Sequence, residues 1–298
     1  MLDRAALKAW FGERCVFGAP AADFTTYRAG GRAEALVSPS TPEELRGLAA
    51  WCRAASVPLL VLGRGSNVLV SDRGLPGVTA LTERLCRLEI KENSVLAEAG
   101  AVWDDLARLS AQAGLSGLEK TSGIPGSVGG AVRMNAGAFG QEACDRLVSV
   151  QAFDGAGRTV SLFKKDIRFG YRQAGGLEDL IIVSARFEFP AGDAASLSAE
   201  RAAVLAARAA KQPLDLPSAG SVFRRPPGDY ASRLIDAAGL KGLRIGGAEV
   251  SPKHAGFIVN AGGATAADIH ALIREVQRRV REKTGVELRL EQILLGEF

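Results

Sequence analysis

The stretch Gly123-Ile-Pro-Gly-Ser-Val-Gly-Gly-Ala-Val-Arg-Met-Asn-Ala-Gly-Ala-Phe-Gly140 contains six glycines in eighteen residues. Glycine has no Cβ, so such a stretch lets backbone N–H groups approach a ligand closely and adopt conformations that other residues avoid. Flexible surface loops are typically rich in Ser, Asn and charge. By contrast, this stretch carries five large apolar side chains, at Ile124, Val128, Val132, Met134 and Phe139. We therefore expect an ordered, packed cradle for a large anionic ligand.

A second glycine turn, Gly63-Arg-Gly-Ser-Asn67, follows an apolar segment at 58–62 that predicts a buried strand. Val68 stands where the dinucleotide fingerprint G-x-G-x-x-G needs its third glycine, and no convincing acidic ribose partner follows. The turn is therefore a weak Rossmann signal. Its flexible backbone donors and two polar side chains favour a phosphate cradle of another kind.

The composition is that of an ordinary globular protein, with 298 residues, 47% of them hydrophobic, and a net charge of +4. Basic residues are scattered and aromatic residues make up only 6%, so we expect no nucleic-acid partner. The first eight residues carry charges where a signal peptide needs an apolar run, and no segment approaches the roughly 18–20 apolar residues of a membrane span. We expect a cytoplasmic monomer without membrane insertion.

A metal site is not expected. The four cysteines lie far apart and lack C-x-x-C spacing: Cys15, Cys52, Cys86 and Cys144. Only two histidines, His254 and His270, could supply imidazole ligands. The sequence also lacks a G-x-S-x-G nucleophile elbow and a P-loop lysine, which disfavours serine hydrolase and phosphate-transfer chemistry.

Mixed α and β elements are expected along the chain. Thr41-Pro-Glu-Glu44 predicts a helix start, with Thr41 as N-cap and Glu44 completing a capping box. The apolar stripe of that helix is predicted at Leu45, Leu48, Ala49 and Cys52. A second capping box, Thr265-x-x-Asp268, predicts a helix that closes near Gly285.

The remaining elements follow from hydrophobic period and turn residues. Strands are expected at 68–70, 94–99, 148–153, 158–162 and 180–189, the last with one solvent-facing side. Helices are expected at 102–113 and 200–211. The segment 190–197 is expected to be a linker or a surface loop.

Eight motifs follow one another along the chain. They are Thr26-Tyr-Arg-Ala-Gly-Gly31, Leu62-Gly-Arg-Gly-Ser-Asn67, Gly114-Leu-Ser-Gly-Leu-Glu119, the Gly123–Gly140 stretch, Ser218-Ala-Gly-Ser-Val-Phe223, Ala238-Gly-Leu-Lys-Gly242, Ile245-Gly-Gly-Ala248 and Lys253-His-Ala255. Each motif alone is a weak signal. In this order, over nearly the whole chain, they closely resemble the UDP-N-acetylenolpyruvoylglucosamine reductase family, flavoenzymes that make UDP-N-acetylmuramate for bacterial peptidoglycan.

The resemblance implies an α+β chain with a noncovalently bound FAD and NADPH as hydride donor. An FAD-binding fold of the vanillyl-alcohol-oxidase / p-cresol methylhydroxylase type, with two α+β subdomains split near residue 85, is expected over 1–195. A C-terminal α+β substrate-binding domain for UDP-N-acetylglucosamine enolpyruvate is expected over 196–298. The flavin-binding part contains no histidine, which excludes histidyl attachment of the cofactor.

The resemblance also implies site residues. Catalytic roles fall on Arg172, on Ser221 as proton donor and on Glu291. Substrate contacts fall on Tyr171, Lys211, Arg225, Lys241 and His254. Expected FAD contacts are Tyr27, Arg28, Gly63, Arg64, Gly65, Ser66, Asn67, Gly123, Ile124, Pro125, Gly126, Ser127, Gly129, Gly130, Asn135, Ala136 and Gly137.

Three features depart from the family pattern. Ala174 replaces a serine, and Leu288-Arg-Leu-Glu-Gln292 replaces the more usual Leu-Glu-x-Glu-Val. No inserted tyrosine-bearing loop occurs between Tyr171 and Lys211. We therefore expect the shorter branch of the family, which closes over its nucleotide differently, and an altered neighbourhood around Glu291.

Two other functions remain open. Another FAD oxidoreductase of the same superfamily would keep the first two-thirds of the chain without needing Ser221, Lys241 and Glu291. A flavin- or nucleotide-binding regulatory module would need none of the three catalytic residues. All of them occur in the contexts of the reductase family.

Overall fold

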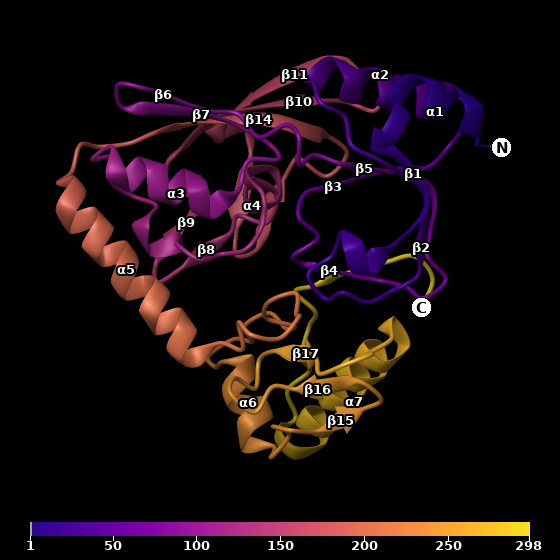
Figure 1. Ribbon diagram of the computed structural model, residues 1–298. Helices are drawn as coiled ribbons and strands as arrows, with labels where there is room; N and C mark the ends of the chain where they lie inside the picture. The colour runs from indigo at the N-terminus through magenta and orange to yellow at the C-terminus, as the bar shows by residue number, and fades with distance from the viewer. Residues whose placement is uncertain (1) are drawn as a thin grey trace. The chain divides into compact units, whose positions relative to one another are not determined.

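The computed structural model describes residues 2–298 and divides into two compact units (Figure 1). The first unit contains Ala35–Arg64, Gly77–Ala207 and the N-terminal segment through Val16. The second contains Phe17–Glu34, Gly65–Pro76 and Arg208–Phe298. Each unit is therefore assembled from separate pieces of the chain. The division into functional domains at 195/196 stays a prediction.

The helices and strands of the first unit are built mainly around one sheet. They are α1 (Arg4–Phe11), α2 (Pro42–Ala54), β3 (Leu59–Leu62), β6 (Leu88–Lys91), β7 (Ser94–Glu98), α3 (Trp103–Gln112), α4 (Val128–Arg133), β8 (Gly137–Ala138), β9 (Gln141–Glu142), β10 (Leu147–Phe153), β11 (Thr159–Phe163), β12 (Arg168–Gly170), β13 (Gln173–Gly175) and β14 (Ile181–Glu188). The sheet has the antiparallel order β11-β10-β14-β7-β6. Helices α3 and α4 lie on one of its faces (Figure 1).

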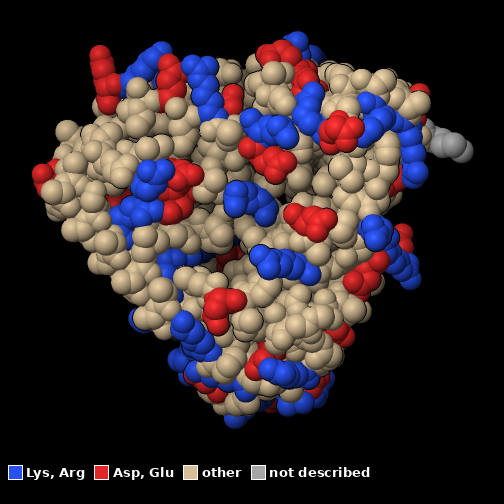
Figure 2. Space-filling view, in the orientation of Figure 1, with Lys and Arg blue, Asp and Glu red and all other residues tan. Residues whose placement is uncertain are grey.

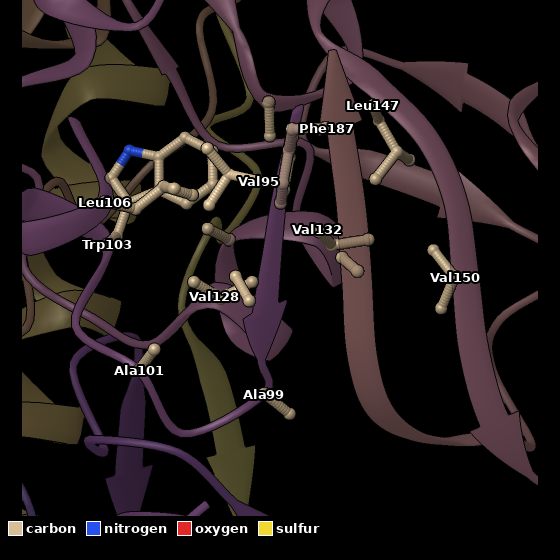
Figure 3. Packing of buried hydrophobic residues seen from close by; sticks show 14 of the residues in the cluster. Val95, Ala99, Ala101, Trp103, Leu106, Val128, Val132, Leu147, Val150 and Phe187 are labelled. Atoms are coloured by element: carbon tan, nitrogen blue, oxygen red, sulfur yellow. The ribbon is translucent and has the colours of Figure 1, made fainter. Parts of the chain in front are cut away.

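The core of the first unit lies between these helices and the sheet. Trp103 and Phe187 are fully buried, with ring centroids 5.9 Å apart in an edge-to-face arrangement. Val128 and Val132 bring α4 into the same cluster (Figure 3). Because α4 lies within the Gly123–Gly140 stretch and α3 packs in the same cluster, this packing orders the stretch. The expectation of an ordered glycine-rich segment is confirmed.

Several local predictions for this unit are confirmed. Strands β10 and β11 pair around the Asp154-Gly155 turn, with Phe153 opposite Thr159. The Thr41 side chain accepts the Glu44 N–H, and the predicted stripe of α2 is buried. The capping box is wrong in its second half. The Glu44 carboxylate instead accepts the Ser40 N–H at 2.7 Å and pairs with Arg14, because that guanidinium lies within reach.

Over residues 182–185 strand β14 is buried on both faces, so the predicted solvent-facing side is missing from that part of the strand. Ile182 and Ala185 contribute to the main core. Val183 and Ser184 are less than 10% exposed and line a cavity of about 250 Å³ together with the first turns of α2. In the second half of the strand the prediction is confirmed, because Arg186 and Glu188 are exposed and alternate with the buried Ala185 and Phe187.

Helix α5 (Ala194–Lys211) begins six residues earlier than predicted, so the predicted linker or surface loop over 190–197 is wrong for residues 194–197. The Asp193 carboxylate accepts the Ser196 N–H at 2.7 Å and caps the first turn. Pro190 and Gly192 near Asp193 favour a loop. The position of Asp193 three residues before Ser196 is instead that of an N-cap.

The second unit combines a small sheet with one long helix. Its elements are β4 (Val68–Val70), α6 (Ala231–Ala237), β15 (Arg244–Ile245), β16 (Ala248–Val250), β17 (Ile258–Asn260), α7 (Ala266–Thr284) and β18 (Ile293–Leu295). The order β15-β16-β17 is antiparallel, and β18 pairs with β4 in parallel. The predicted α7 is confirmed, with its capping box and with Gly285 at a left-handed φ of 73°.

Three strands carry the chain from one unit into the other. They are β1 (Cys15–Pro20), β2 (Arg32–Val37) and β5 (Leu75–Leu81), in a sheet of order β1-β2-β5-β3. Helix α5 likewise passes from the first unit into the second. The fold as a whole is the expected α+β class.

The described residues 2–298 contain no helix long and apolar enough to cross a membrane. Within the same residues, no group of three or more His, Cys, Asp or Glu side chains could hold a metal ion. Lys and Arg mix with Asp and Glu over the face displayed in Figure 2, with no extended region of one sign there.

Candidate active site

The start of the Gly123–Gly140 stretch is held by the first turn of α3. The indole Nε1–H of Trp103 donates to Thr121 Oγ1 at 3.0 Å, and the Trp103 N–H donates to the Gly126 carbonyl at 3.1 Å. The Gly123 N–H donates to Asp104 Oδ1 at 2.7 Å. The carboxylate of Asp104 also pairs with Arg201 of α5. Asp104 gave no signal in the sequence, because its partners are 19 and 97 residues away.

The first turn of α4, in the middle of the stretch, is also held by hydrogen bonds. The Val128 and Gly129 N–H groups donate to the carbonyls of Ala101 and Ala99, both at 2.8 Å. The Gly130 N–H donates to Ser127 Oγ at 3.3 Å. These three N–H groups are therefore used inside the protein. At Gly129 the lack of a side chain allows the close approach, because a Cβ there would lie 3.0 Å from the Cβ of Ala99.

Ser127 also lies directly against Gly63, the first residue of the other glycine turn. A Cβ placed on Gly63 would come within 2.0 Å of Ser127 Oγ and 2.9 Å of its Cβ. Two segments predicted separately as cofactor supports are thus adjacent within the first unit. Neither 63–67 nor 123–135 contains an acidic residue, so both suit an anionic ligand.

The other predicted cofactor residues of this region lie around the same backbone. Ile124 and Ala136 are half-buried against the core, and Arg64 is exposed. Gly137 is in β8, where a Cβ would lie 2.7 Å from the Gln141 carbonyl oxygen. Pro125 is exposed. Their direct contact with FAD stays a prediction.

In the second unit, Gly65 and Asn67 are tied to neighbouring segments. Gly65 has a φ of 59°, and a Cβ there would lie 2.3 Å from the Phe24 carbonyl oxygen. The Asn67 carbonyl accepts the Ile293 N–H at 3.0 Å, and Asn67 Nδ2 donates to the Glu291 carbonyl at 3.2 Å. Ser66 is half-buried between them. A predicted cofactor residue thus supports the backbone of a predicted catalytic residue.

Tyr27 and Arg28 lie in another turn of this unit, and the side chain of Asn260 holds its backbone. Tyr27 is fully buried, and burial raises the pKa of its hydroxyl. Arg28 is exposed and takes a left-handed φ of 52°. The buried Asn260 donates from Nδ2 to the carbonyls of both residues, at 3.1 and 3.4 Å. Asn260 was missed because it is more than 230 residues away in sequence.

Ser221 and Glu291 are brought side by side by short backbone pairings. Ser221 forms a bridge with Phe257, and Phe223 forms one with Leu290. The Glu291 N–H donates to the Val222 carbonyl at 2.9 Å. Both predicted catalytic side chains are half-buried. Although 70 positions separate them, the second unit places them on neighbouring segments.

Arg172 lies in the first unit, in the two-residue turn between β12 and β13. Gly170 and Gln173 pair across the turn, and Arg172 takes a left-handed φ of 55°. A non-glycine residue there is strained, and such residues concentrate at functional sites. The guanidinium carbon lies 5.3 Å from the centre of the Tyr171 ring. The departure Ala174 is buried opposite Phe169 and packs against the core, where a hydroxyl is not needed.

A buried asparagine holds this turn. Asn135 is 1% exposed, and its Nδ2 donates to the Gly170 carbonyl at 3.2 Å and to Glu142 Oε2 at 2.7 Å. Its Oδ1 accepts the Cys144 N–H at 3.0 Å. Predicted as a cofactor contact, Asn135 therefore also supports the Arg172 turn. Glu142 was missed because nothing in its own segment marks it as a partner.

Three of the predicted substrate residues form a cationic region in the second unit. His254 is half-buried, and burial together with Lys241 and Lys211 lowers the pKa of its imidazole. Lys241 pairs with Asp236 at 2.7 Å on the surface. Arg225, also predicted, stacks over the Tyr230 ring at 4.5 Å. These side chains suit phosphate or carboxylate groups of a substrate.

We expect His254 to be a neutral donor at neutral pH. Its Nδ1 accepts the Gly256 N–H at 3.1 Å, which leaves the proton on Nε2. Its pKa lies below the ordinary 6.5, so the stabilisation from the neutral form is complete above that pH and is lost as the pH falls through the folded-state pKa. Nitrogen-15 NMR of a His270→Asn variant, which leaves one histidine, should report the Nε2–H tautomer at pH 7. An imidazolium signal at pH 7 would contradict this assignment.

Comparisons with known proteins identify the class of this fold and site. A sequence profile described as "FAD binding domain" matches residues 33–162. A second profile, described as "UDP-N-acetylenolpyruvoylglucosamine reductase, C-terminal domain", matches residues 212–295. The chain is therefore an α+β flavin-binding protein of the oxidoreductase type.

Full-length relatives identify the family. The UDP-N-acetylenolpyruvoylglucosamine reductase of Pediococcus pentosaceus is 39% identical, covering 100% of this chain and 99% of that protein. The Synechococcus enzyme is 45% identical, with 94% and 93% covered. The crystal structure of the enzyme from Thermus caldophilus superposes with a TM-score of 0.81 at 37% identity, covering 95% and 98%. This chain belongs to the UDP-N-acetylenolpyruvoylglucosamine reductase family.

Proposed function

We propose that this protein reduces UDP-N-acetylglucosamine enolpyruvate to UDP-N-acetylmuramate in peptidoglycan precursor synthesis, with noncovalent FAD and NADPH. We further propose that it works in the cytoplasm as a monomer. The single observation that carries the reaction is the pairing of Glu291 N–H with the Val222 carbonyl, which sets Ser221 and Glu291 on neighbouring segments. Family membership supplies the substrate class.

The residues present fit a bound FAD. Gly63 and Ser127 approach so closely that only glycine is tolerated, and the two segments they belong to carry no acidic side chain. We assign the diphosphate and ring support to these segments. Tyr27, Arg28 and the 65–67 turn, which belong to the second unit, are also proposed as FAD contacts. FAD supplies hydride transfer from NADPH to C3 of the enolpyruvyl group.

The chain's own residues stabilise the negative charge and donate the proton. Addition of hydride at C3 builds negative charge at C2 that spreads onto the adjacent carboxylate. The guanidinium of Arg172 holds that carboxylate. The Ser221 hydroxyl then donates its proton to C2, which is basic enough to be protonated by a well-placed alcohol. Glu291 stabilises the enol or assists this protonation.

The substrate-binding residues act away from the reacting atoms. Lys211, Lys241 and Arg225 provide positive charge for the diphosphate, and His254 provides a neutral Nε2–H donor. Tyr171, 45% exposed, lies beside Arg172 and covers part of the substrate. Closure over the nucleotide then depends on these residues, because the chain lacks an inserted tyrosine loop.

The function is tested by spectrum and by turnover. Purified protein should show the visible absorption of oxidised flavin, and gentle denaturation should release free FAD. NADPH oxidation should accelerate when UDP-N-acetylglucosamine enolpyruvate is added, with UDP-N-acetylmuramate as product. Protein that stays colourless after incubation with FAD would overturn every flavin function. A flavoprotein that ignores this substrate would favour another oxidoreductase of the superfamily.

Gly63→Ala should weaken FAD binding at least tenfold. The new methyl group would overlap Ser127, so the two glycine segments must move apart. Gly155→Ala is the matched control, because Gly155 is exposed in a hairpin turn and its added Cβ would meet only Arg53 at 4.0 Å. Fluorescence titration of the apoproteins with FAD measures both. Equal affinities for the two variants would remove Gly63 from the cofactor support.

A further inference from the structure

Gln292 is the departure from the family pattern that the proposed reaction leaves without a role. It directly follows Glu291 and directly precedes β18, yet it is only 4% exposed. Glutamine is rarely buried unless its amide is fully paired. The surroundings of this side chain therefore explain why the chain carries an amide here.

The amide of Gln292 is satisfied at both ends. Its Oε1 accepts the hydroxyl of the fully buried Tyr27 at 3.0 Å. Its Nε2 donates to the carbonyls of Ala219 at 3.0 Å and Gly220 at 3.3 Å. Carbonyl oxygens only accept hydrogen bonds, so the NH₂ end must face residues 219 and 220. Chemistry thus determines the orientation of the amide.

Hydrogen bonds hold the backbone on both sides of Ser221. Gln292 holds the carbonyl of Gly220, just before Ser221, and the Glu291 N–H holds the carbonyl of Val222, just after it. Gly220 has a left-handed φ of 73°, so the segment turns at this point. Two consecutive residues, 291 and 292, therefore determine where the Ser221 backbone lies relative to Glu291.

We propose that Gln292 is a positioning residue that holds the Ser221 hydroxyl and Glu291 at the spacing needed to protonate C2. The inference rests on the proposed function and adds a residue to it. Proton donation depends on geometry, and a displacement of about 1 Å can reduce a rate about a hundredfold. The valine usual in the family pattern has no group that could form any of these three hydrogen bonds.

Gln292→Met is the main test, because methionine has nearly the same shape and cannot make the three hydrogen bonds. Oxidation of the reduced flavin by UDP-N-acetylglucosamine enolpyruvate should slow at least tenfold. Flavin reduction by NADPH and the FAD content should stay within about twofold of wild type. Stopped-flow absorbance measures the two half-reactions separately.

Gln277→Met is the matched control. The Gln277 Nε2 also donates to a backbone carbonyl of the same unit, that of Leu288 at 2.8 Å, but it does not bond the residues next to Ser221. Its half-reactions should equal those of wild type. Hydrogen exchange of the apoproteins should speed up over 218–223 for Gln292→Met alone. Equal behaviour of the two variants, or equal slowing of both half-reactions by Gln292→Met, would overturn the proposal.

Gln292→Glu provides a second variant in case Gln292→Met folds poorly. An ionised carboxylate can still accept from Tyr27 but cannot donate to residues 219 and 220, whereas a protonated one can donate to one of them. The rate of the oxidative half-reaction in Gln292→Glu, divided by the wild-type rate at the same pH, should therefore rise as the pH is lowered. A flat ratio would contradict the positioning role. Wild-type protein that fails to oxidise its flavin with this substrate would instead overturn the proposed function.

Discussion

Ser221→Ala should leave flavin reduction by NADPH near the wild-type rate and slow oxidation of the reduced flavin by UDP-N-acetylglucosamine enolpyruvate by about 10²–10⁴-fold. The size follows from the usual contribution of a positioned proton donor. The hydroxyl is the only group the substitution removes. The backbone of the segment is held separately, by the bridge to Phe257 and by the Glu291 N–H on Val222. The geometry should therefore survive.

Stopped-flow measurement of each half-reaction distinguishes the proton donor from a binding residue. A binding residue would alter the substrate concentration needed for half-maximal rate, whereas a proton donor alters the limiting rate. Ser196→Ala, at an exposed position of α5, should change neither half-reaction. Equal losses in both half-reactions for Ser221→Ala would show that Ser221 does not donate the proton.

Arg172→Lys should slow the same oxidative half-reaction by about 10²–10³-fold and weaken substrate binding, although the charge is kept. Lysine is a point charge and cannot reproduce the two parallel hydrogen bonds of a guanidinium to a carboxylate. Preorganised donors at a developing negative charge are worth several kcal/mol each, typically about 3–4. The loss should therefore appear in the limiting rate as well as in affinity.

The structure supplies a close control for this substitution. Arg168 is exposed in β12 of the same hairpin, so Arg168→Lys changes the same residue type without touching the turn. Its half-reactions should match those of wild type. If Arg172→Lys behaved like Arg168→Lys, another cation would have to hold the substrate carboxylate.

Local signals predicted elements well where the stabilising contacts are themselves local. The Thr265–Asp268 capping box and Gly285 mark both ends of α7, because caps form between residues three or four apart. The α5 start was missed although Asp193 and Ser196 are also close, because Pro and Gly residues nearby favoured a loop. The burial of both faces over residues 182–185 of β14 was missed because it depends on which elements cover each face, whereas the exposed side at Arg186 and Glu188 follows the local alternation.

The candidate site shows the same difference between local signals and distant contacts. The motifs, in their order along the chain, predicted Ser221, Glu291 and Arg172 as candidate catalytic residues. They could not predict that Asn135 holds the turn of Arg172 from 35 residues away. They also could not predict that Asn260 supports Tyr27 and Arg28. Side-chain bonds to distant backbone leave no periodic pattern in either segment.

The sequence by itself determined the α+β class, the family and the glycine-rich supports, because glycine content, caps and ordered motifs are properties of neighbouring residues. Tertiary structure alone decided why position 63 needs a glycine, since the close approach of Ser127 to Gly63 arises only on folding. It also gave Gln292, which departs from the family pattern, hydrogen bonds to both Tyr27 and the Ser221 segment. The Tyr27 hydroxyl and Gln292 are 265 positions apart, and only packing brings such groups within 3.0 Å.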